Sequence, residues 1–166
     1  MTAPSDVIRA MFAHHLWATR ALVDRLESLS GAELDTAIPG TYGGMLVTLT
    51  HLVDADGRYL QRLEDPTPPP YEERDGAPLA ELRRDLDEHE RRWGDALDRL
   101  EAGTLHARIA GRDDYPDTDH AEVLLLLQAI HHGNDHRTQI CSTLGALTLE
   151  VPDLDGWEFW TSTHPA

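Results

Sequence analysis

Four long stretches of the sequence repeat apolar residues at intervals of three and four positions, which is the period of a helix with one buried face. The first stretch begins after Ser5, a residue that favours the N-cap position, and stops at Gly31. The second begins near Gly44, and the third follows Pro78 and ends before Gly103. We expect each stretch to form a helix.

The fourth stretch opens at Thr118 or Asp119, where Glu122 has the spacing of a capping box, and runs to about Leu147. The connections between the stretches show no strand alternation, and one of them is the proline-rich segment EDPTPPPYEERDGA. The pattern therefore predicts an all-α protein, a four-helix bundle with long connecting loops.

Composition agrees with a single domain over residues 1–166, because 40% of the residues are hydrophobic and 27% are charged. The aromatic tail is expected to belong to this domain, with Trp157 or Trp160 packed back on the bundle. The 30 acidic residues outnumber the 14 basic ones, and the net charge of −16 disfavours nucleic acid and membrane surfaces as partners. The N-terminus has no signal-peptide pattern, and Cys141, the single cysteine, is expected to be a small packed residue, so we expect a cytoplasmic location.

Candidate chemistry begins with the segment IHHGNDHRTQI, in which His132 and His136 lie four residues apart. The apolar stripe of the fourth helix passes through both, so both side chains are expected to face the core. Two buried imidazoles one turn apart must either find hydrogen-bond acceptors or share a cation, because unsatisfied buried polar groups are costly. Spacing alone leaves the third ligand open among His15, His51 and His89, since periodicity permits His51 without preferring it.

Three segments carry a more specific pattern. LTHLVDADGRYLQRL has a histidine early in the second helix, HHGNDHRTQICSTLG fits H-x-x-x-H-R-x-Q in the last helix, and MFAHHLWATRALVDRLESL contains Trp17. Together they resemble the DinB-like family of metal-binding four-helix bundles over most of the chain. The resemblance implies a metal triad of His51, His132 and His136. Thr138 departs from the family, in which a glycine is common at that place.

Three neutral imidazoles leave coordination positions open for water or substrate, as in a catalytic metal site. Imidazole suits several transition metals, and we expect a divalent ion, zinc or nickel. The resemblance implies a metal-dependent enzyme that activates a low-molecular-weight thiol for S-transfer to a small electrophile. The alternatives are a metal-dependent hydrolase and a non-catalytic metal- or ligand-binding stress protein. The chain has no Glu-x-x-His pair, which removes the ligand motif of a ferritin-like di-iron bundle.

Several other side chains are candidates for supporting such a site. Arg137 is a candidate for binding an anionic group of the substrate, and His15 for lining the pocket. Asp54 and Asp135 are candidates for orienting the ligand imidazoles, although acidic residues on helices are more often solvated. We expect a small-molecule substrate as partner and allow for a homodimer, in which His131 lies at the contact or points away from the site.

Overall fold

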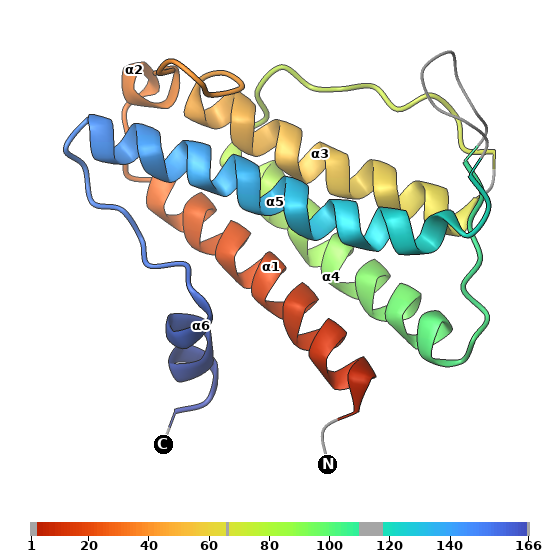
Figure 1. Ribbon diagram of the computed structural model, residues 1–166. Coiled ribbons are helices and arrows are strands. Elements are labelled where there is room, and N and C mark those ends of the chain that lie inside the picture. The colour runs from red at the N-terminus through yellow and green to blue at the C-terminus, as the bar shows by residue number, and fades with distance from the viewer. Residues whose placement is uncertain (1–2, 66, 110–117, 166) are drawn as a thin grey trace.

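The computed structural model describes residues 3–65, 67–109 and 118–165, and this part of the chain is helical between its connections. Four long helices form the bundle and two short ones lie beside it (Figure 1), which confirms the predicted fold class. None of the described helices combines the length and the apolar character that crossing a membrane requires. The helices are α1 (Pro4–Leu26), α2 (Gly31–Leu34), α3 (Met45–Glu64), α4 (Leu79–Glu101), α5 (Ala121–Ala146) and α6 (Gly156–Thr163).

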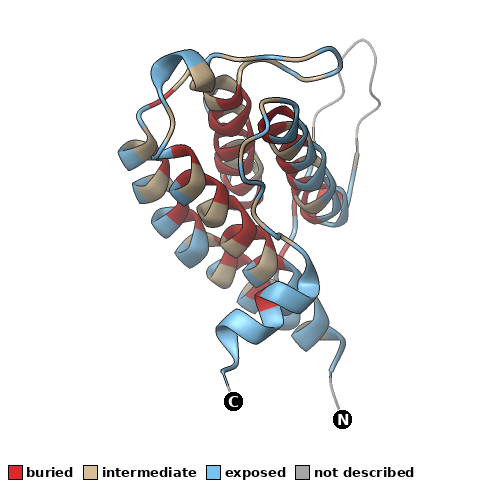
Figure 2. Ribbon diagram, turned by 90° about the vertical axis from the view of Figure 1, so that its left-hand side faces the viewer, coloured by how far each residue is buried: buried red, intermediate tan, exposed pale blue. Residues whose placement is uncertain are grey.

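The four long helices enclose one apolar core. α1 contacts α4 and α5, and α3 contacts the same two helices from the other side. Each helix turns its apolar stripe to the centre, so that the buried residues face inward (Figure 2). This arrangement places α3 directly against α5, the two helices that carry the candidate ligands. The largest fully buried side chains are Trp93, Phe12, Leu22, Leu26, Met45, Leu49, Leu52, Leu60, Leu63, Leu82, Leu86 and Ile140.

The predicted starts of the second and third helices are confirmed, and each has a local cause. Gly44 precedes α3, and its carbonyl accepts a hydrogen bond from the backbone N–H of Thr48 at 2.9 Å; a side chain at Gly44 would place its Cβ only 2.8 Å from the backbone oxygen of Asp35. Pro78 precedes α4, and its carbonyl accepts hydrogen bonds from the backbone N–H groups of Glu81 and Leu82. Backbone geometry thus fixes where both helices begin.

The start expected for α1 is two residues too late, and its cap is a different residue. The helix begins at Pro4, so that Ser5 lies inside it and does not act as the N-cap. The carboxylate of Asp6 instead accepts a hydrogen bond from the backbone N–H of Ala3 at 2.8 Å. An acidic residue in the first turn also interacts favourably with the helix dipole, so Asp6 stabilises the start of α1 from the N3 position and not as an N-cap residue.

The start expected for α5 is also different, because the predicted capping residue has another partner. α5 begins at Ala121, later than the predicted Thr118 or Asp119. Glu122 forms no capping box with either of them, since its carboxylate accepts a hydrogen bond from the backbone N–H of Ala107 at 2.9 Å. The contact is tertiary: it ties the chain that follows α4 to the first turn of α5.

The tail packs on α1 through Phe159, and the prediction that Trp157 or Trp160 would do so was wrong. Phe159 is 9% exposed, and its ring centroid lies 5.5 Å from those of His14 and Trp17. Trp157 and Trp160 are 81% and 56% exposed. The short helix α6 turns only one side toward α1. Trp157 lies two positions from Phe159, about 200° away around the helix, and Trp160 lies one position away, about 100°. The helical register therefore places Phe159, and neither tryptophan, on the side of α6 that packs against α1.

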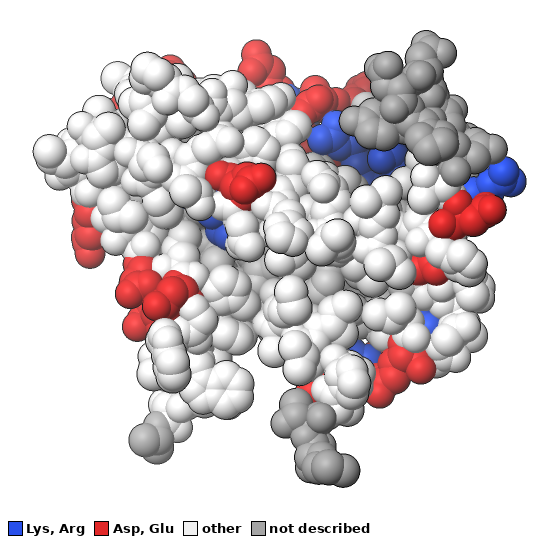
Figure 3. Space-filling model, in the orientation of Figure 1, with Lys and Arg blue, Asp and Glu red and all other residues white. Residues whose placement is uncertain are grey.

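Charge is unevenly distributed over the surface. On the face that α1, α5 and α6 form, Figure 3 shows acidic groups mostly around the edge and large uncharged areas between them. The largest group of arginine atoms on this view lies over the C-terminal half of α3, next to acidic groups. A protein with a net charge of −16 therefore has a local basic area, and it lies on a helix that carries a candidate ligand.

Candidate metal centre

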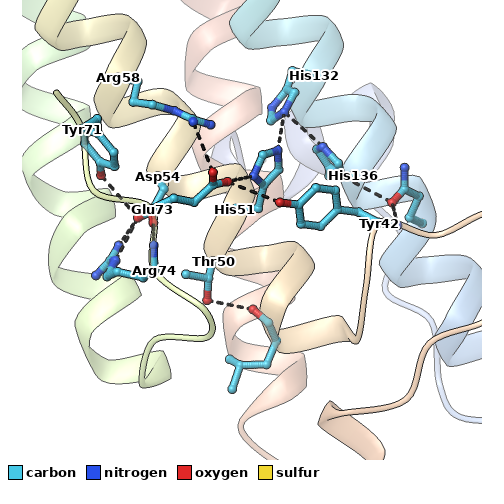
Figure 4. Close-up of polar contacts among 12 residues, drawn as sticks. Tyr42, Thr50, His51, Asp54, Arg58, Tyr71, Glu73, Arg74, His132 and His136 are labelled. Carbon is cyan, nitrogen blue, oxygen red and sulfur yellow. Dashed lines mark hydrogen bonds and ion pairs between the residues drawn. The ribbon is translucent and has the colours of Figure 1, made fainter.

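The side chains of three histidines converge between α3 and α5 (Figure 4). His51 comes from α3, and His132 and His136 come from successive turns of α5. The Nε2 atom of His132 lies 3.1 Å from the Nε2 atoms of both His51 and His136. Within the described residues, this is the one group of histidine, cysteine and acidic side chains with ligand atoms close enough together to hold a metal ion. The structure therefore brings together the three residues that the sequence resemblance implied.

His51 reaches this group although it lies off the apolar stripe of its helix, because α3 is buried over a wide face. Residues 48–50 and 52–57 are all buried, and the side chain of His51 is 14% exposed. A helix enclosed on this many sides has no single buried line that periodicity could detect. The sequence pattern could thus permit His51 without selecting it, whereas His132 and His136 follow the narrower stripe of α5.

The arrangement of the ring nitrogens fits a bound transition-metal ion. With metal–nitrogen bonds of about 2.0–2.1 Å at tetrahedral angles, two ligand nitrogens lie roughly 3.4 Å apart, which is close to the separations from His132. Burial, followed by the neighbouring rings of His136 and His51, lowers the pKa of His132 to about 4. Burial lowers the pKa of His136 as well. These two rings are therefore neutral near pH 7, the form in which imidazole binds a metal.

Two residues outside the bundle helices hold the ring of His51. Glu73, in the connector between α3 and α4, accepts a hydrogen bond from Nδ1 of His51, and this bond lowers the pKa of the carboxyl group. The ring of Tyr42 stacks on His51, with centroids 4.1 Å apart and planes at 19°. Its hydroxyl donates to the same Glu73 oxygen at 3.4 Å. Because Nδ1 faces a carboxylate, the lone pair of His51 is on Nε2, toward the other two histidines.

Gln139 orients the ring of His136 in a similar way. Its Oε1 atom lies 3.3 Å from Nδ1 of His136 and accepts a hydrogen bond from the backbone N–H of Tyr42 at 2.8 Å. One amide oxygen thus positions a ring on α5 and also the loop whose tyrosine stacks on His51. Gln139 is the last residue of the H-x-x-x-H-R-x-Q pattern, so the motif itself contained this signal. Tyr42 and Glu73 lie in connections without periodicity, so the sequence pattern predicted neither of them.

His15 and Arg137 belong to a separate buried network and not to the histidine triad. His15 Nε2 lies 2.6 Å from Asp56 Oδ2. Arg137 Nη1 lies 3.1 Å from His15 Nδ1 and donates to the hydroxyl of Thr19 at 3.0 Å. Gly133 leaves room for these contacts, because a Cβ there would lie 2.4 Å from His15 Cε1. The network ties α1, α3 and α5 together.

The acidic residues expected beside the ligand rings are found in other places. Asp54 is fully buried and accepts hydrogen bonds from the backbone N–H and Nε of Arg74, at 3.0 and 2.9 Å, and from the Tyr71 hydroxyl at 3.3 Å. It therefore fixes the connector that carries Glu73 and supports His51 indirectly. Asp135 is exposed on α5.

The other histidine and cysteine candidates lie outside the triad. His89 is buried in α4, where burial lowers its pKa, and His131 is exposed on α5. Cys141 is partly buried against the core, and burial raises the pKa of its thiol. A protonated, packed thiol is a poor nucleophile, which agrees with the packing role expected for Cys141.

Comparison with known proteins bears on the identity of the chain. The model of the DinB family matches residues 1–165. No curated protein matches the chain in sequence. The family match spans the four helices of the bundle and all three converging histidines, and it agrees with the resemblance that the sequence motifs carry. The chain belongs to the DinB family.

Proposed function

We propose that His51, His132 and His136 bind one divalent metal ion, zinc or nickel, and that the protein is an enzyme that transfers a low-molecular-weight thiol to a small electrophile. The observation that carries the proposal is the convergence of three ring nitrogens that no fourth histidine, cysteine or carboxylate joins within the described residues. Structural zinc sites are usually closed by four protein ligands, whereas three leave room for a small molecule.

A divalent ion at such a site lowers the pKa of a coordinated thiol, so that thiolate is available near neutral pH. Hydrogen bonds from neighbouring residues orient two of the three ligand rings toward the metal position. Glu73 holds the Nδ1 side of His51, and Gln139 holds that of His136. The Nε2 atoms consequently face one point before any ion is bound, which reduces the ordering that binding requires.

The surroundings of the triad favour thiol transfer over hydrolysis. Enzymes that activate water commonly place a carboxylate or histidine as general base near the reacting atoms. Glu73 is the described carboxylate in contact with the triad, and it is already engaged by His51, Tyr42 and Arg58. A thiol has a pKa of about 8.5 and ionises far more readily than water, so thiol activation depends less on such a base.

A turnover assay tests this proposal. The zinc- and nickel-loaded protein is incubated with small thiols and electrophiles, and loss of free thiol is followed; parallel reactions contain esters and amides without thiol. We expect thiol-dependent turnover that His51→Ala abolishes and His131→Ala preserves, with unchanged helical circular dichroism in both variants. Turnover of esters or amides without thiol would identify a hydrolase. Absence of all turnover in metal-loaded protein would favour a binding protein and contradict the proposal.

A further inference from the structure

Arg58 lies beside the triad on the same side of α3 as His51. The two residues are seven positions apart, which is about two helical turns. Figure 4 shows the guanidinium of Arg58 extending over Glu73 toward the histidine rings. Glu73 links the two residues, since one of its oxygens accepts from His51 Nδ1 and the other lies 3.6 Å from Arg58 Nη1. The Glu73 carboxylate therefore lies between the positive charge of Arg58 and the ring of His51.

The guanidinium of Arg58 has room for a further acceptor. Its side chain is 26% exposed, and its contacts with described residues include the ion pair with Glu73 and a position over the Tyr71 ring, 5.8 Å from the centroid. A guanidinium offers five N–H donors in a planar fork, and a carboxylate matches two of them at once. A bound carboxylate can therefore add to the existing contacts of Arg58.

Two other arginines that are candidates for binding an anionic ligand make their contacts elsewhere. Arg74 donates to Asp54 and, at 2.8 Å, to Asp85. Arg137, which the sequence analysis offered for this role, is 4% exposed and makes its contacts inside the buried network with His15. Arg58 is thus the better placed of the three for meeting a molecule that reaches the triad.

The charge distribution around Arg58 differs from that of the protein as a whole. A net charge of −16 repels anionic ligands over most of the surface, yet arginine atoms gather over the C-terminal half of α3 (Figure 3). Arg58 and Arg62 lie on adjacent turns of that half. The positive charge of Arg58 beside the triad locally offsets this repulsion.

We propose that Arg58 binds the carboxylate of the thiol that the triad activates, which makes carboxylated low-molecular-weight thiols the substrate class. The inference rests on the proposed thiol transfer and deepens it. Arg58 determines specificity and is not a catalytic residue: the guanidinium holds the carboxylate from α3 while the sulfur of the same molecule reaches the open side of the three histidines.

Ligand binding to the cobalt-loaded protein tests the inference, because the visible absorption of the ion responds to a coordinated sulfur. The probes are 3-mercaptopropionate and the neutral 2-mercaptoethanol. We expect the unmodified protein to bind the carboxylated thiol about 10- to 100-fold more tightly. Arg58→Gln should lose this preference and keep its affinity for the neutral thiol, and Arg58→Lys should retain part of it. Arg84→Gln, which removes an exposed arginine on α4, is the matched control.

The other outcomes separate the two proposals. Equal loss of both thiols in Arg58→Gln would mean that Arg58 acts only through the position of Glu73, which would overturn the inference. Equal affinity of the unmodified protein for both thiols would overturn the inference and leave thiol transfer standing. An absorption spectrum that neither thiol changes would overturn both.

Discussion

His15 Nε2 lies 2.6 Å from Asp56 Oδ2, and each of these side chains is 1% exposed. The pair joins α1 to α3 in the middle of the bundle, and Arg137 completes the connection from α5. Polar groups this deeply buried are stable only when they satisfy one another. The network therefore holds three helices in register next to the triad.

Asp56→Ala is predicted to lower the free energy of unfolding by about 2–4 kcal/mol, because His15 loses its acceptor and Arg137 stays buried without the nearby carboxylate. Urea unfolding followed by circular dichroism measures the change. Asp87→Ala is the control, since Asp87 pairs with Arg20 at the surface and is 69% exposed, and its cost should stay below about 0.5 kcal/mol. Similar small losses in both variants would show that the buried network contributes little.

Gly133→Ala is predicted to destabilise the protein by about 1–3 kcal/mol, although alanine is the better helix former. The added Cβ would lie 2.4 Å from Cε1 and 2.6 Å from Nδ1 of the buried His15. Gly94→Ala is a matched control in α4, where the added Cβ has nothing within 4 Å, and it should stabilise by about 0.5–1 kcal/mol. Thermal unfolding of the two variants should therefore shift in opposite directions; a gain in stability for both would contradict the close packing around His15.

The parts of this molecule that follow from local sequence were predictable. The starts of α3 and α4 follow from Gly44 and Pro78, and the inward orientation of His132 and His136 follows from the stripe of α5. These features depend on a few neighbouring residues and on the helical period. His51 required the family motif, because the buried face of α3 is too wide for periodicity to choose among its positions.

The parts that depend on tertiary contacts were not predictable from the pattern. Glu73 reaches His51 from a proline-rich connector whose path is set by the binding of Arg74 to Asp54. The sequence gives no sign that these distant residues meet. For the same reason, Asp54 was a candidate for contact with a ligand ring, whereas the structure places it under the connector.

Glu73→Ala is predicted to weaken metal binding by about 10- to 100-fold, because Nδ1 of His51 would lose the acceptor that orients its ring. Competition with a chelator of known affinity measures the effect. Glu72→Ala removes the adjacent exposed carboxylate and should bind the ion as tightly as the unmodified protein. If both variants retain full affinity, the hydrogen bond between Glu73 and His51 does not position the ligand.

The three converging histidines are predicted to bind one divalent ion, and equilibrium dialysis with zinc or nickel on two neighbouring variants tests this most directly. His132→Gln removes a ligand from the triad, whereas His131→Gln changes the exposed residue beside it. The two variants have identical amino-acid compositions, so they differ only in which histidine is replaced. We predict about one ion per chain in the unmodified protein and in His131→Gln, and at least about 100-fold weaker binding in His132→Gln. Equal binding by the two variants would contradict the assignment of the metal centre.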